Sequence, residues 1–196
     1  MNYFARFENI DGDLFRFDTR IYLNGFDPER ESVCVGAMVG KNPGSATPKV
    51  LGELAPLELN RDKMLPVVRN RFNEAYRLAG KPLPLNAFVR VWNLFYICDP
   101  VLDSAIEKAA KFQVLPLCST ENEVVPVIWY GWGGDDQRIL SFKERFLDRG
   151  SNVQFFYDHR RKEVIAQKPT AGFFARHTQG MPKKPIIEHL ITIVQS

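Results

Sequence analysis

Residues 33–45, with the sequence VCVGAMVGKNPGS, decide the fold of this chain. The stretch 33–39 is a near-continuous run of small, apolar and β-branched residues, which is typical of a strand covered on both faces in a parallel sheet. The run stops at Gly40, and a polar loop built around Pro43 and Gly44 follows. Because ligands of open α/β sheets bind beyond the carboxyl ends of the strands, we expect the functional centre at residues 40–45.

Strands and helices alternate along the rest of the chain. Apolar runs predict further strands at residues 87–98, 124–131 and 153–157. Helical periodicity and end signals predict helices at residues 65–79, 103–112, 135–149 and 185–194. This order predicts an α/β fold, with three α/β/α layers around a central, mostly parallel four-stranded sheet.

The N-terminal part has a different pattern. Residues 3–10 and 14–21 flank an Asp11-Gly12 turn, and the second segment alternates strictly between apolar and polar residues. This pattern predicts a β-hairpin that extends or flanks one edge of the sheet. We therefore expect one domain over residues 1–196, with residues 1–30 as a hairpin extension.

Composition excludes several classes of protein. The chain has 196 residues, 45% of them hydrophobic and 25% charged, which is typical of a globular domain and not of a disordered or fibrous chain. No apolar run is long enough to span a bilayer, and the first residues lack the order of a signal peptide. Cys34, Cys98 and Cys118 have no metal-binding spacing. We expect a cytoplasmic protein with no cofactor, no metal and no membrane contact, and the sequence leaves the oligomeric state open.

Basic residues are concentrated in residues 137–184. This stretch has eleven Lys or Arg against four Asp or Glu, a net charge of +7, whereas the whole chain has a net charge of +3. Such a stretch could attract the phosphates of a nucleic acid, or it could be a solvated helix face and loop. The sequence leaves both interpretations open.

The loop after the first buried strand does not match a phosphate-binding P-loop. Gly36 and Gly40 are separated by one residue too few, and Asn42 replaces the Ser or Thr that reaches magnesium. Pro43 instead holds Asn42 extended, so that its amide is presented at the strand end. A plain Asn-Pro-Gly turn is the alternative.

Two other polar residues stand at informative places. Asn93 interrupts the apolar run 89–97, where an unpaired amide is costly. It either ties strands together or reads the edge of a nucleobase. His177 lies in a polar loop and could donate to a developing negative charge, whereas His159 and His189 are interpreted as surface or packing residues.

These residues occur in an order that resembles an uncharacterised microbial family, domain of unknown function 1643. The similarity extends from about Val33 to Pro182 and leaves out the N-terminal hairpin. The corresponding segments are Asn42-Pro43-Gly44-Ser45-Ala46, Asn93-Leu94-Phe95 with Asp99-Pro100, Trp132-Gly133, and Arg176-His177.

More remotely, the order is similar to that of the uracil-DNA glycosylase superfamily, whose mismatch-specific branch has a G-x-N-P-G first motif. The resemblance implies that Asn42 positions the attacking water, that Asn93 reads the base and that His177 stabilises the leaving base. The substrate-binding residues that it implies are Gly40, Lys41, Pro43, Gly44, Ser45, Asn93, Phe95, Trp132 and Arg176. The chain departs from the pattern in having no aromatic residue between Asn42 and Phe72 to stack on a flipped base.

Three hypotheses follow. The first is a glycosylase-like hydrolase that cleaves an N-glycosidic bond in DNA or in a free nucleotide. The second is a non-catalytic module that binds a nucleotide or nucleic acid through the same residues. The third is an enzyme that acts on a small molecule unrelated to nucleic acid.

Overall fold

The computed structural model describes residues 1–44, 48–59, 62–134, 136–178 and 180–196. Ser45, which the sequence places in the candidate loop, lies outside the described residues. Among the residues that are described, no helix is both long and apolar enough to cross a membrane.

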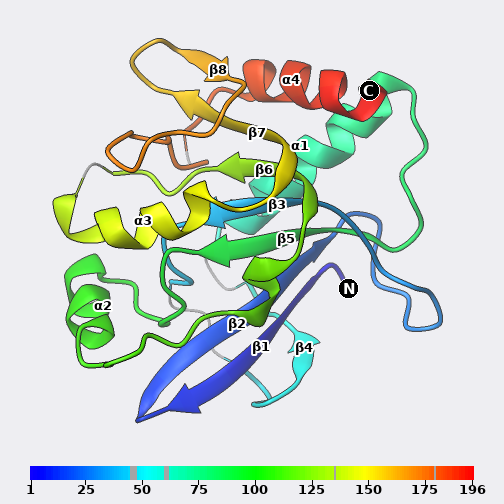
Figure 1. The fold of residues 1–196 in the computed structure, drawn as a ribbon. Helices are drawn as coiled ribbons and strands as arrows, with labels where there is room; N and C mark the ends of the chain where they lie inside the picture. Colours follow the sequence, from blue (N-terminus) through cyan, green and yellow to red (C-terminus); the bar gives the residue numbers. More distant parts are fainter. Residues whose placement is uncertain (45–47, 60–61, 135, 179) are drawn as a thin grey trace.

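One mixed sheet forms the centre of the molecule (Figure 1). Its eight strands lie in the order β4 (Leu54–Pro56), β1 (Tyr3–Ile10), β2 (Asp13–Tyr22), β5 (Ala87–Asn93), β3 (Val33–Gly40), β6 (Val125–Tyr130), β7 (Ser151–Asp158) and β8 (Glu163–Ile165). The neighbours β5, β3, β6 and β7 pair in parallel, and all the other pairs are antiparallel.

The expected α/β class is confirmed, but the expected sheet of four strands is too small. The N-terminal hairpin joins the sheet through β2, which pairs with β5 from Thr19↔Val91 to Tyr22↔Phe88. The short strands β4 and β8 then add to the two edges. Each has only three residues, which is too short for an alternating pattern to be detected in the sequence.

Helices cover both faces of the sheet. The helices α1 (Met64–Ala79) and α4 (Lys183–Gln195) pack against each other and against one hydrophobic cluster. The helices α2 (Leu102–Ala109) and α3 (Leu140–Leu147) contribute to a second cluster on the opposite face. Helix α1 buries Leu65, Val68 and Phe72 at helical spacing and ends at Gly80, whose φ of 66° is left-handed, as the sequence predicts.

The second parallel strand is shorter than its apolar run indicates. Strand β5 ends at Asn93, where the Leu94 N–H donates to Gly40 O as the last bond of its ladder with β3, and strand β3 itself ends at Gly40. The chain then crosses to the start of β2, where the Arg16 N–H donates to Tyr96 O at 2.9 Å. Asn93 is therefore a strand-end residue and does not lie in mid-strand.

Two helices also differ from their expected bounds. The helix expected from residue 135 begins at Leu140, because residues Gln137–Ile139 form a 3-10 turn that precedes α3. The helix expected to run to residue 112 ends at Ala109.

Candidate functional site

The carboxyl ends of the parallel strands lie along one edge of the sheet. In Figure 1 the arrowheads of β5 and β6 point to the same side of the molecule. Gly40 at the end of β3 is in register with Asn93 at the end of β5, and Val39 is in register with Tyr130 at the end of β6. Loops that follow these strands therefore start side by side, as ligand-binding loops of open α/β sheets do.

Asn93 is the most unusual polar residue at this edge. Its side chain has no exposed surface, and neither Nδ2 nor Oδ1 has a hydrogen-bond partner among the described residues. A Cβ atom built on Gly40 would lie 3.1 Å from Asn93 Oδ1 and 3.4 Å from Met64 Sδ, so the glycine leaves room beside the amide. An unpaired buried polar group costs roughly 1–3 kcal/mol. Among the described residues, the amide of Asn93 makes no bond that would tie two strands together.

Asn42 is held by one hydrogen bond. Its Nδ2 donates to the backbone carbonyl of Asp99 at 2.5 Å. The Asp99 carboxylate is fixed in turn, because it accepts from Ser104 Oγ at 2.6 Å and from Lys108 Nζ at 2.9 Å. The amide oxygen Oδ1 of Asn42 is of the type that accepts a hydrogen bond from a water or a ligand.

His177 and Lys41 lie next to a pair of glycines that follow β6. A Cβ built on Gly133 would lie 3.4 Å from His177 Cβ, and one built on Gly134 would lie 3.4 Å from Lys41 Nζ. Both glycines have left-handed φ values, 60° and 65°, which other residues rarely adopt. The glycines therefore allow the backbone after β6 to pass close to both side chains.

Burial keeps His177 and Lys41 less basic than usual. Burial lowers the pKa of His177, the nearby charge of Lys41 lowers it further, and Asp62 opposes both effects. Burial also lowers the pKa of Lys41, against the opposing charge of Asp136. Since the ordinary pKa of histidine is about 6.5, His177 is a neutral imidazole at pH 7.

Asp62 is a site residue that sequence reasoning missed. Its Oδ1 accepts from the N–H groups of Met64 and Leu65, at 2.8 and 3.3 Å, at the start of α1. An Asp just before a helix is a recognisable capping signal, and this signal could have identified it. We call Lys41, Asn42, Asp62, Asn93 and His177 the strand-end site.

The remaining residues of the loop have supporting positions. Pro43 is buried, and Gly44 has a left-handed φ of 71° with nothing within 4 Å of a built Cβ. Gly44 therefore supplies a turn that a larger residue would strain.

Two expected substrate-binding residues lie in the core and not at the site. Phe95 has no exposed surface and packs against Phe142, with ring centroids 5.5 Å apart. Trp132 is also fully buried, and its Nε1 donates to the carbonyl of Phe173 at 3.3 Å. Both belong to the hydrophobic cluster on the α2–α3 face, so neither ring is placed to stack on a ligand at the strand-end site.

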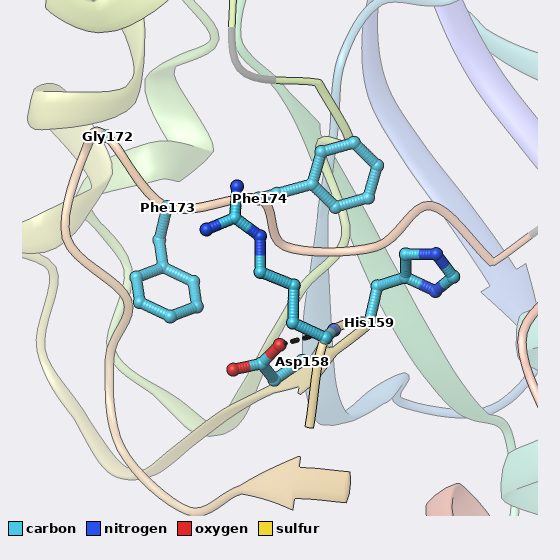
Figure 2. Close-up of a pocket in the computed structure, with 6 residues that line it drawn as sticks. Asp158, His159, Gly172, Phe173 and Phe174 are labelled. Atoms are coloured by element: carbon cyan, nitrogen blue, oxygen red, sulfur yellow. Dashed lines mark hydrogen bonds between the residues drawn. The ribbon is translucent and has the colours of Figure 1, made fainter. Parts of the chain in front are cut away.

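Arg176 points towards the end of β7. Its Nη1 contacts the ring of His159, and its Nη2 donates to Gly180 O at 3.0 Å. His159, interpreted from sequence as a surface residue, is exposed but lines a cavity of about 280 Å³ together with Asp158, Arg160, Gly172, Phe173 and Phe174 (Figure 2).

The rings of the two phenylalanines point to different sides of their loop (Figure 2). Phe173 packs edge-on against Phe156, with ring centroids 5.1 Å apart. The ring centroids of Phe174 and His159 are 6.2 Å apart. Arg176, which contacts the cavity-lining His159, directly precedes His177 in the sequence.

Metal and thiol chemistry find little support. Within the described parts of the chain, no group of three or more His, Cys, Asp or Glu side chains is placed to hold a metal ion. Burial raises the pKa of Cys34, and burial raises that of Cys98 to about 11 against the opposing effect of Arg16. Both thiols are therefore protonated at neutral pH and are poor nucleophiles.

Comparisons with models of known protein families, with curated proteins and with solved structures found no match to this chain. The functional argument therefore rests on the residues of the strand-end site and their surroundings.

Proposed function

We propose that the strand-end site binds a nucleobase or nucleotide and hydrolyses its N-glycosidic bond. The observation that carries the proposal is the buried amide of Asn93, whose donor and acceptor both lack a partner among the described residues. An amide offers a donor and an acceptor side by side, and a base edge with the opposite pair satisfies both atoms at once. Binding would then recover the free energy that the unpaired amide costs the protein.

The other residues of the strand-end site would supply the groups that the hydrolytic steps need. Asn42, anchored on Asp99 O, would present Oδ1 to the attacking water. The neutral imidazole of His177 would donate a hydrogen bond to the negative charge that develops on the leaving base. Lys41, whose charge already acts on His177, would add to this stabilisation.

We also propose that the parallel strands β5, β3, β6 and β7 form a glycosylase-like core. Support comes from the parallel pairing of these four strands and from the order of Asn42, Asn93 and His177 along the chain. A duplex substrate would have to flip its base to reach Asn93, because that residue has no exposed surface.

A base-release assay tests the proposal. The protein is incubated with single- and double-stranded oligonucleotides that bear uracil or hypoxanthine, and with the free nucleotides dUMP and IMP, and released base and abasic sites are measured. We expect release by the wild type and a loss of about 100-fold or more in Asn42→Ala. Asn70→Ala, at an exposed position of α1, is the matched control and should retain full activity. Absence of base release from every substrate would refute the hydrolase.

A second candidate, a non-catalytic nucleic-acid module, is favoured by the cavity at the end of β7. Phe173 and Phe174 are 37% and 36% exposed there, beside Arg160 and His159. Exposed aromatic rings next to basic side chains are typical of surfaces on which single-stranded bases stack.

The basic stretch 137–184 supports the nucleic-acid module less than its net charge indicates, because several of its basic side chains are paired or buried. Arg145 and Arg149 bind the buried carboxylate of Glu121, at 2.9 and 3.0 Å, and Lys143 is fully buried. Binding of an oligonucleotide without base release, weakening steeply with salt and lost in Phe174→Ala, would favour the module over the enzyme.

A further inference from the structure

Arg16, on strand β2 of the N-terminal hairpin, has a buried guanidinium with no hydrogen-bond partner. The residue has no exposed surface, and none of Nε, Nη1 and Nη2 has a partner among the described residues. The closest acidic group is Asp62, whose Oδ2 lies 3.8 Å from Nη1, beyond hydrogen-bond distance. Within the described part of the chain, the five N–H donors of this guanidinium have no acceptor.

The hairpin delivers this side chain to the edge that carries the strand-end site. The backbone of Arg16 is bonded to Tyr96, three residues past Asn93, and its side chain reaches Asp62 at the start of α1. Asn93 also lies on the α1 side of the sheet, since Gly40 and Met64 are its neighbours. Arg16 and Asn93 therefore approach the beginning of α1 from adjacent strands of the sheet.

The protein itself does not complete the environment of Arg16. Asp62 already uses Oδ1 for two N–H groups of α1. Cys98, the other group whose charge would act on Arg16, has a pKa of about 11, raised by burial, and so is a neutral thiol. A guanidinium offers parallel N–H groups that match the oxygens of a phosphate in a bidentate arrangement.

We propose that Arg16 binds a phosphate group of the ligand whose base pairs with Asn93, so that the substrate is a nucleoside phosphate and not a free base or nucleoside. The identity of the base rests on the proposed function, whereas the phosphate subsite rests on Arg16 alone. The phosphate belongs either to a free nucleotide or to the backbone of a nucleic acid, and the two sources are separable by experiment.

Isothermal titration with dUMP, deoxyuridine and inorganic phosphate tests the subsite. We expect the wild type to bind dUMP about tenfold or more tightly than deoxyuridine, because one bidentate charged contact contributes about 1.4 kcal/mol or more. In Arg16→Met the two affinities should become equal, and binding of inorganic phosphate should be lost. Arg30→Met, with a half-exposed side chain, is the matched control and should behave as the wild type.

The outcomes separate this inference from the proposed function. If inorganic phosphate binds the wild type but not Arg16→Met, and no base is released or recognised, the subsite stands and the hydrolase fails. If Arg16→Met keeps the preference for dUMP, or weakens deoxyuridine as much as dUMP, the subsite is refuted. Arg16→Lys keeps the charge but loses the planar guanidinium, so it should retain part of the preference for dUMP over deoxyuridine. This variant tests the phosphate subsite if Arg16→Met does not fold.

A uracil-bearing oligonucleotide identifies the source of the phosphate. Binding much tighter than that of dUMP, with the same loss in Arg16→Met, would assign the contact to the backbone of a nucleic acid. Equal or weaker binding would assign it to a free nucleotide.

Discussion

Two buried arginines of the sheet differ in what surrounds their guanidinium groups. Arg90 on β5 donates to Asp18 Oδ1 and to Glu123 Oε2, both at 2.6 Å, whereas Arg16 donates to no described residue. We expect Arg90→Met to lower the free energy of unfolding by about 2 kcal/mol, because both carboxylates lose the Arg90 donor, although Asp18 keeps its ion pair with Arg20. Arg16→Met should change it by less than about 1 kcal/mol, or raise it, because an unsatisfied buried charge is removed. Urea denaturation of both variants is the measurement; equal destabilisation would mean that Arg16 has a structural role.

The same reasoning applies to the amide of Asn93. Asn93→Leu has a similar volume and removes two unpaired polar atoms, so the free energy of unfolding should stay within about 1 kcal/mol of the wild type or rise. Binding and base release should nevertheless be abolished, because the leucine cannot pair with a base edge. Thermal unfolding and the titration with dUMP measure the two effects, and a strongly destabilised but active variant would contradict the role assigned to Asn93.

His177 should set the acid limb of the pH profile. Burial and the charge of Lys41 lower its pKa, so the neutral imidazole persists below pH 6.5 and is lost only as the pH falls through the lowered value. Activity should therefore fall on the acid side at a pH below 6.5. In Lys41→Met the charge is gone, so the acid limb should move to higher pH, and NMR titration of the His177 ring should show the same direction. An unchanged or downward shift would contradict the coupling between the two residues.

At the scale of elements, the glycine that ends β3 leads to a separate prediction. The φ of Gly40 is not left-handed, so alanine is compatible with its backbone, but the added Cβ would lie 3.1 Å from Asn93 Oδ1. We expect Gly40→Ala to displace the amide and to weaken dUMP binding about tenfold or more, with little loss of stability. Gly150→Ala, whose Cβ meets only Val124 at an ordinary 3.6 Å, is the matched control. Unchanged affinity in Gly40→Ala would argue that the ligand does not contact Asn93.

The elements also show where sequence reasoning succeeds. Strand β3 and helix α1 carry local signals, a buried apolar run and a helical stripe closed by Gly80, and both lie close to their expected bounds. The end of β5 carries no local signal, because residues 94–97 remain apolar although the pairing partner β3 ends at Gly40 and their backbone bonds instead with the start of β2. A long-range pairing, not a residue type, ends that strand.

At the scale of the molecule, the role proposed for Arg16 also depends on long-range pairing and so could not be predicted from the sequence. The sequence identifies Asn42 because it follows a predicted strand, Asn93 because it interrupts an apolar run, and His177 because it lies in a polar loop. It predicts the hairpin, but not that β2 pairs with β5 and so brings Arg16 to the carboxyl edge of the parallel strands. Such a contact between distant segments follows from the order of strands in the sheet, which periodicity does not encode.

The burial of this site has a kinetic consequence. Arg16 and Asn93 have no exposed surface, so a ligand can contact them only after the residues that cover them move. In stopped-flow mixing with dUMP, we expect the observed rate to reach a plateau set by this opening, with an apparent association rate constant below about 10⁵ M⁻¹s⁻¹. The plateau should stay unchanged in Arg16→Met at equal saturation, because the substitution alters the contact and not the opening. An observed rate that rises linearly with ligand concentration, with a rate constant typical of protein association, would contradict this prediction. It would show that the binding site is open before the ligand arrives and that the first contacts are not those with Arg16 and Asn93.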